Sequence, residues 1–275
     1  MDGGGSSPVG DRVLIEISGG VADVRLNRPD KLNALDGAMF EGIVAAGERL
    51  RCEPGLRAVV LSGAGRGFCA GLDKARFASM AGGRADTALS DLVTRTHGIA
   101  NAPQQAALAW RDIPVPVIAA IHGVALGGGF QIALGSDIRY VAPDARLSIL
   151  EVKWGLVPDM AGIALMRELA RADVIRELTF TGRVFSGAEA LTYGFATAVH
   201  ADPLAAAHET AREIAGRSPD AVRAIKRLLN RASDDDAASL LLAESREQAA
   251  LIGSENQVEA ARAGVEGRAG RFADP

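Results

Sequence analysis

Residues 115–134 read VPVIAAIHGVALGGGFQIAL, and this stretch decides how the chain folds. It lies within residues 113–136, which contain no Asp, Glu, Lys or Arg and are long enough for a membrane-spanning helix to be considered. Prolines, a histidine, a glutamine and three consecutive glycines interrupt the segment, and such residues break a continuous helix. We therefore predict a buried strand over residues 115–121, a glycine turn, and a short buried helix over residues 128–134.

Further elements are expected on both sides, wherever an apolar run is bounded by glycine, proline or a capping residue. The predicted strands cover residues 13–17, 21–26, 58–61, 138–141 and 147–149, and the first two form a hairpin. The predicted helices run from a cap at Asp36 to Arg51 and from about Leu89 to Trp110, the second after a surface loop over residues 81–88. From Ala161 onward the sequence favours helices almost to its end, with Pro219 suited to a first helical turn.

Strand and helix units thus come first and helices follow. This order implies an α/β core that carries a C-terminal helical region. We place the core at residues 11–200 and the helical region at residues 201–275. No linker between them is long or polar enough to separate independent domains.

The composition argues against several classes of function. Aromatic residues make up only 4% of the chain and the formal net charge is -4, so neither a base-stacking surface nor a basic field for nucleic acid is expected. Cys52 and Cys69 are too few for a disulfide framework and fit a reducing cytoplasm. No spacing of His, Cys and carboxylates suggests a metal site. Residues 1–10 are rich in Gly and Ser and do not resemble a signal peptide.

The glycine-rich segment Gly63–Gly67 follows a predicted strand, as phosphate-binding loops do. The dinucleotide fingerprint fails at its sixth position, which is Phe68, and the chain contains no G-x-x-x-x-G-K-[ST] string. Taken alone, the segment favours a flexible turn over a nucleotide site.

The triplet Gly127-Gly128-Gly129 stands where a strand gives way to a helix, and such a helix start leaves backbone N–H groups unpaired. A second N–H, from the turn at Gly71-Leu72, would complete a pair of donors for a developing oxyanion. Close packing around the helix is the alternative explanation, and glycines alone favour it.

Five segments occur in a characteristic order and spacing. They are Asn27-Arg28-Pro29 with Leu32-Asn33-Ala34-Leu35, Phe68–Asp73, His122-Gly123 with Gly127–Gly129, Glu151 with Gly155–Pro158, and Glu266 with Arg268 and Phe272. Together they resemble the crotonase (enoyl-CoA hydratase/isomerase) superfamily. The resemblance implies a core of repeated ββα units, and a helical region that builds a homotrimer or a hexamer made of two trimers. It also implies an enzyme that acts on an acyl-CoA, in which CoA is part of the substrate and no separate cofactor is expected. The cysteine content, the composition and the interrupted apolar segment lead us to expect a cytoplasmic protein with no nucleic-acid or membrane partner.

The resemblance also assigns roles to individual residues. The backbone N–H groups of Leu72 and Gly128 form an oxyanion hole for the thioester oxygen as an enolate develops, and Glu151 transfers protons. The residues expected to contact CoA are Lys31, Leu32 and Ala34 at its adenine end, and Ala70, Asp73 and Lys74 near its pantetheine. The acyl pocket is expected along the segment from Phe77 to His97.

Two positions bear on the reaction type. Hydratases of the family use two glutamates to place and split a water, and the first of these is Gln131 here, an amide that is no general base. Asp159 follows Glu151 in a string that resembles dienoyl-CoA isomerases, where two acids shuttle a proton between distant carbons. Those isomerases carry an aspartate at the position of Gln131, so the match is incomplete. A helix cap is the alternative for Asp159, and a surface charge is the alternative for Glu151.

These residues therefore favour isomerisation of an enoyl-CoA over its hydration, because only one of the two hydratase glutamates is present. The other hypotheses are hydrolysis of the thioester, with Glu151 activating water, and a non-catalytic scaffold that binds acyl-CoA. His122 is expected to bond the backbone at a strand end, and His97 is expected to lie in a helix as a structural or lid residue.

Overall fold

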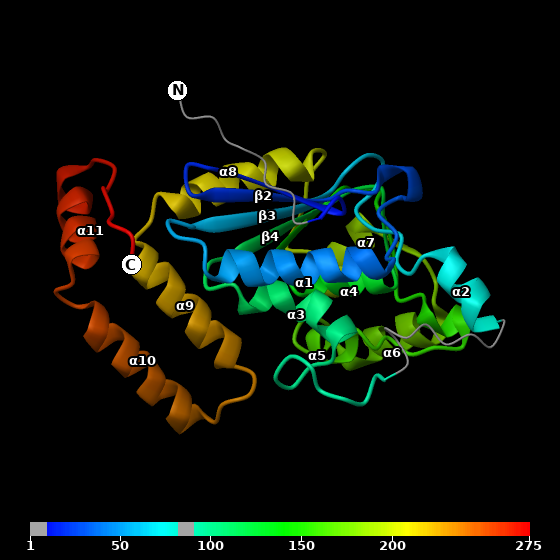
Figure 1. Cartoon of the computed structure of the whole chain (residues 1–275). Helices are drawn as coiled ribbons and strands as arrows, with labels where there is room; N and C mark the ends of the chain where they lie inside the picture. The colour runs from blue at the N-terminus through cyan, green and yellow to red at the C-terminus, as the bar shows by residue number, and fades with distance from the viewer. Residues whose placement is uncertain (1–9, 82–90) are drawn as a thin grey trace.

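A computed structural model describes residues 10–81 and 91–275, and it has the predicted α/β architecture with helices following the core (Figure 1). The strands are β1 (Val13–Ser18), β2 (Val21–Leu26), β3 (Ala58–Gly63), β4 (Val117–Ile121), β5 (Val124–Leu126), β6 (Ile138–Val141), β7 (Arg146–Ser148), β8 (Phe185–Ser186) and β9 (Ala198–Val199). The helices are α1 (Gly37–Arg51), α2 (Lys74–Ala81), α3 (Ala102–Asp112), α4 (Gly128–Leu134), α5 (Gly162–Met166), α6 (Ala172–Thr181), α7 (Gly187–Tyr193), α8 (Pro203–Ala215), α9 (Pro219–Arg231), α10 (Ala237–Leu251) and α11 (Glu255–Glu266), with the 3-10 turns η1 (Pro29–Lys31) and η3 (Glu151–Trp154).

The main sheet has the strand order β1-β2-β3-β4-β6-β9. The predicted hairpin is confirmed, with β1 antiparallel to β2, and the remaining neighbours run parallel. Every residue of β3 and β4 is buried, as expected for central parallel strands covered on both faces. Figure 1 shows α8 on one face of this sheet and α1, α3 and α4 on the other.

A second sheet, β5-β7-β8, follows directly from the first and positions α4. β5 lies inside the segment predicted as a plain glycine turn. It was missed because three residues between glycines are too few to show the alternation of apolar and polar residues that indicates a strand. The short strands β8 and β9 were likewise missed within the stretch predicted to be helical. The helix predicted over residues 128–134 is confirmed as α4, and β4 begins at Val117, two residues later than expected.

The helix predicted from Leu89 to Trp110 is wrong at its start, because α3 begins at Ala102. The Asn101 side chain accepts a hydrogen bond from the Gln104 N–H, and the Gln104 side chain accepts one from the Asn101 N–H. This reciprocal cap fixes the first turn at Asn101, and Ile99 just before it is 90% exposed. The loop predicted over residues 81–88 lies outside the described residues, except that Ala81 ends α2.

The predicted cap at Asp36 and helix start at Pro219 are both confirmed. Helix α8 packs on the sheet through Ala207 and Ala211, while α9, α10 and α11 extend beyond the sheet (Figure 1). Helix α9 is attached by Lys226, whose buried ammonium donates to the carbonyls of Trp110 and Val115 and to the Asp137 carboxylate. The division at residue 200 stays a prediction. Among the described residues, no helix is both long and apolar enough to span a membrane.

Candidate active site

Two loops expected to contact CoA lie side by side. The Leu32 carbonyl accepts a bond from the Ala70 N–H, and Leu35 pairs with Gly71 and Asp73 through two further backbone bonds. Asn33, which is fully buried, donates to the carbonyls of three residues that precede Ala70: Ala64, Gly67 and Phe68. The two loops therefore form one hydrogen-bonded unit, and Asn33 is the buried side chain that contributes three of its bonds.

Asp73 links this unit to α2 through its side chain, and its expected contact with pantetheine stays a prediction. Its carboxylate accepts a hydrogen bond from Arg28 and another from the Ala75 N–H at the start of α2. These bonds, led by the one from Ala75, lower the pKa of Asp73. Arg28 also donates to the Ala34 carbonyl, so this ion pair ties both loops to α2. Lys31 and Lys74 are exposed on the same unit.

Two backbone N–H groups lie at the inner edge of this unit. Leu72 forms a parallel bridge with Leu35, and Leu35 bonds the residues on either side of Leu72. In such a bridge the N–H of Leu72 itself points away from Leu35. Gly128 is the first residue of α4, where an N–H has no acceptor within its helix. A side chain on Gly71 would lie 3.6 Å from the Gly128 nitrogen, which places the two turns against each other.

The absence of a side chain at Gly128 has a packing reason. A Cβ there would lie 2.7 Å from the Met160 sulfur and 2.9 Å from Leu35. The alternative explanation by close packing therefore holds for the α-carbon of Gly128. It leaves the N–H of Gly128 available, because that group points out of the helix start.

Glu151 begins η3 and lies against the start of α4. Its Oε1 accepts a hydrogen bond of 2.6 Å from the Gln131 side-chain amide. Its Oε2 is buried and has no hydrogen-bond partner among the described residues. The two oxygens of this carboxylate are thus unequal, one held by the protein and one free. The alternative of a surface charge is wrong, since Glu151 is 9% exposed.

Gln131 is held as firmly as the carboxylate it contacts. Its Oε1 accepts bonds from the backbone N–H groups of Met160 and Gly162, at 2.9 and 3.0 Å. A side chain at Gly162 would collide with that oxygen. Both lone pairs of the Gln131 carbonyl are therefore used, and its amide orientation is fixed with the N–H toward Glu151.

The surroundings of Glu151 favour its protonated form. Burial is the largest cause and raises the pKa of Glu151, while the bond from Gln131 opposes this and the charge of Asp159 adds to it. Asp159 is exposed on one side. The protein partly buries its carboxyl group on the other side, and this burial raises the pKa of Asp159 as well. A buried carboxyl group with a raised pKa is typical of side chains that transfer protons in active sites.

A family model for enoyl-CoA hydratase/isomerase matches residues 16–275. The chain belongs to this family. Membership confirms the resemblance to the crotonase superfamily and identifies the protein as an enzyme of the hydratase/isomerase type. Solved structures agree with it. The putative enoyl-CoA hydratase of Streptomyces coelicolor A3(2) superposes with a TM-score of 0.86 at 31% identity, covering 99% of this chain and 98% of that chain.

Curated relatives of the family include both reaction types. The chain is 35% identical over 217 residues to the human mitochondrial Delta(3,5)-Delta(2,4)-dienoyl-CoA isomerase, a match covering 75% of this chain and 64% of the relative, less than two thirds of its length. It is 32% identical over 265 residues to the probable enoyl-CoA hydratase echA8 of Mycobacterium bovis, covering 95% of this chain and 98% of the relative.

The structure also tests the structural alternatives predicted for the other candidate residues. Asp159 does not cap the helix that follows, because α5 begins at Gly162 and its N-cap is Ala161 in a left-handed conformation. The His122 Nε2 bonds the Gly65 carbonyl at 2.9 Å, which confirms its predicted backbone contact. His97 lies in a tight turn, where it exchanges backbone bonds with Ala100, and its predicted helix is wrong.

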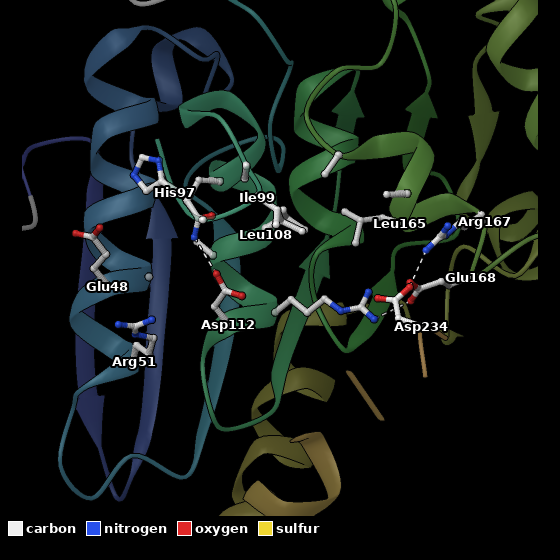
Figure 2. A pocket seen from close by; sticks show the side chains of 18 residues that line it. Glu48, Arg51, His97, Ile99, Leu108, Asp112, Leu165, Arg167, Glu168 and Asp234 are labelled. Carbon is white, nitrogen blue, oxygen red and sulfur yellow. Dashed lines mark hydrogen bonds and ion pairs between the residues drawn. The ribbon is translucent and has the colours of Figure 1, made fainter. Parts of the chain in front are cut away.

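His97 also lines a cavity of about 700 Å³ between α1, α3 and α5 (Figure 2). Glu151 is not among the residues of this cavity. Two ion pairs line it, Arg111 with Glu168 at 2.8 Å and Arg167 with Asp234 at 3.0 Å. In the described part of the chain, no group of three or more His, Cys, Asp or Glu residues could hold a metal ion.

Proposed function

We propose that the protein moves a double bond in an enoyl-CoA thioester, with Glu151 as the proton carrier. The observation that carries this proposal is the hydrogen bonding of Gln131 and Glu151. Gln131 holds Oε1 of the carboxylate and leaves Oε2 free. One buried oxygen with a raised pKa is suited to remove a proton from carbon next to the thioester and to return it farther along the acyl chain.

The same bonds argue against hydration. A hydratase of this family needs two carboxylates to hold and split a water. Gln131 offers neither a base nor a spare acceptor, because Met160 and Gly162 occupy its carbonyl. It acts instead as a positioning residue that fixes which oxygen of Glu151 faces the substrate.

The negative charge that develops on the thioester oxygen requires donors. The N–H groups of Leu72 and Gly128 are the candidates, since the bridge to Leu35 and the helix start leave both pointing away from their own elements. A single preorganised donor of this kind is typically worth about 2.7 to 4 kcal/mol in the transition state.

CoA itself is proposed to lie along the joined loops. Leu32, Ala34 and Ala70 belong to these loops and offer backbone groups for contact with CoA. Lys31 and Lys74 provide exposed positive charge for its phosphates. A homotrimer or a pair of trimers, built through the C-terminal helices, and a cytoplasmic location complete the proposal.

Asp159 is proposed as the second proton carrier of the isomerisation. Asp159→Asn is expected to lower the isomerisation of a dienoyl-CoA by about tenfold or more, because a positioned acid or base contributes at least that much. The same change removes a negative charge that raises the pKa of Glu151, so the acid limb of the remaining activity moves to lower pH. Rates measured from pH 5 to 9 check both effects. Unchanged isomerisation would remove Asp159 from the mechanism.

The pH dependence of the wild-type enzyme is also determined by Glu151. Because burial raises the pKa of this carboxyl group, it loses its proton at a higher pH than an ordinary glutamate. The base form accumulates as pH rises, so kcat/KM is expected to increase with pH through an acid limb above the usual glutamate range. A profile that is flat down to about pH 4, the ordinary glutamate pKa, would contradict this expectation.

The direct test of the proposal compares three reactions on the same protein. Isomerisation of 3-enoyl-CoA and dienoyl-CoA esters is expected to exceed hydration of crotonyl-CoA. Release of free CoA, detected with a thiol reagent, would instead indicate thioester hydrolysis. Tight binding of acyl-CoA without any turnover would indicate a scaffold. Rapid hydration of crotonyl-CoA would show that the preference for isomerisation is wrong.

A further inference from the structure

An aromatic stack lies on the turn that carries Glu151. Glu151 and Trp154 are the first and last residues of η3, and side chains three residues apart eclipse each other in a 3-10 turn. Both side chains therefore project from the same side of the turn. The ring of Trp154 stacks on the ring of Phe77 from α2, with centroids 4.1 Å apart and planes 16° apart.

The stack connects the two halves of the proposed active site. Phe77 lies in the first turns of α2, five residues after Leu72, so it belongs to the segment of one proposed oxyanion donor. Trp154 belongs to the segment of the proposed base. Glu151, whose Oε2 is buried without a hydrogen-bond partner among the described residues, begins the same turn that Trp154 ends. An acyl group that reaches this oxygen therefore passes close to the turn that carries Trp154.

The surface around the stack is apolar. Trp154 is 48% exposed, and the next apolar side chains along the chain, Leu156 and Val157, are exposed as well. A half-exposed tryptophan that stacks on a second ring offers a large, rigid apolar wall. Such a wall is suited to contact with an apolar acyl chain.

We propose that Phe77 and Trp154 are specificity-determining residues that form the end wall of the acyl site and restrict the substrate to short acyl chains. This inference rests on the proposed function, and it adds the substrate class. Removing either ring opens space beyond the reacting carbons. The kcat/KM for long acyl chains then rises relative to that for short ones.

The test compares Phe77→Ala and Trp154→Ala with Phe180→Ala as the matched control. Phe180 is an aromatic side chain on α6 that is 74% exposed. The quantity measured is the ratio of kcat/KM for 3-dodecenoyl-CoA to that for 3-hexenoyl-CoA. This ratio is expected to rise by about tenfold or more in both stack variants, the scale on which apolar pockets discriminate, and to stay unchanged in the control. Circular dichroism confirms that each variant is folded.

Tryptophan fluorescence provides a second readout that does not depend on turnover. The chain has two tryptophans, and Trp110 is fully buried, so acyl-CoA binding beside Trp154 is expected to change the emission. If the wild type isomerises short esters and a folded Phe77→Ala variant keeps the same chain-length ratio, the proposed role of the rings is wrong and the proposed function stands. A wild type that binds short esters preferentially but converts none would overturn the proposed function and leave the wall intact. No response to any acyl-CoA would overturn both.

Discussion

Glu151→Gln is expected to reduce isomerisation by about 10²- to 10⁴-fold while acyl-CoA binding survives. The substitution removes the proton carrier and leaves the shape of the side chain nearly unchanged, and general acid–base groups contribute on this scale. The new amide oxygen can still accept the bond that Gln131 donates to Oε1. Its nitrogen takes the place of the free Oε2, which has no partner to lose. Single-turnover rates and fluorescence titration with an acyl-CoA measure the two quantities separately.

The control for this prediction is Glu209→Gln, an exposed glutamate on α8. It carries the same chemical change on the helix that covers the outer face of the sheet, and it is expected to keep wild-type rates. Loss of binding with an unchanged rate constant in Glu151→Gln would contradict the role of Glu151 as proton carrier. Equal losses in both variants would show that the change acts through net charge.

The order of elements was predictable because most boundaries in this chain are marked by strong local signals. The Asp36 cap, the hairpin glycines and Pro219 act within a few residues of their own positions, and the structure confirms each. The start of α3 depended on the reciprocal cap between Asn101 and Gln104. That signal is present in the sequence, but the alanines and apolar residues around it suggested a longer helix.

Pairings over long distances could not be predicted in the same way. Asn33 belongs to one of the five family segments. Nothing in its neighbouring residues indicates that its side-chain amide donates hydrogen bonds to three carbonyls more than 30 residues away. The contacts of Gln131 with Met160 and Gly162 depend equally on how η3 and α5 return to α4. The sequence identified Gln131 as a departure from the hydratase pattern, and only the folded chain supplies its partners.

These partners make Gln131→Glu the sharpest test of the reaction type. A glutamate at this position places a second carboxylate where the amide now lies 2.6 Å from Oε1 of Glu151. Two carboxylates at that distance cannot both be ionised, so the pair retains a proton and the pKa of Glu151 rises further. Isomerisation at neutral pH is expected to fall by roughly 10- to 100-fold, because once the pKa exceeds the pH of the assay, each further unit of increase lowers the ionised fraction tenfold. The acid limb of the pH profile moves to higher pH.

The rate of crotonyl-CoA hydration, measured on the same variant, distinguishes an isomerase from a hydratase. If the site were a hydratase that had lost its first glutamate, Gln131→Glu would raise crotonyl-CoA hydration by at least about tenfold, equivalent to roughly 1.4 kcal/mol of barrier. We expect no such gain, because one oxygen of the new carboxylate takes the bonds from Met160 and Gly162 and the other faces Glu151. Neither oxygen is then left to hold a water. Gln131→Met is the neutral control, which disturbs the same bonds without adding charge, and its acid limb is expected to stay below that of Gln131→Glu.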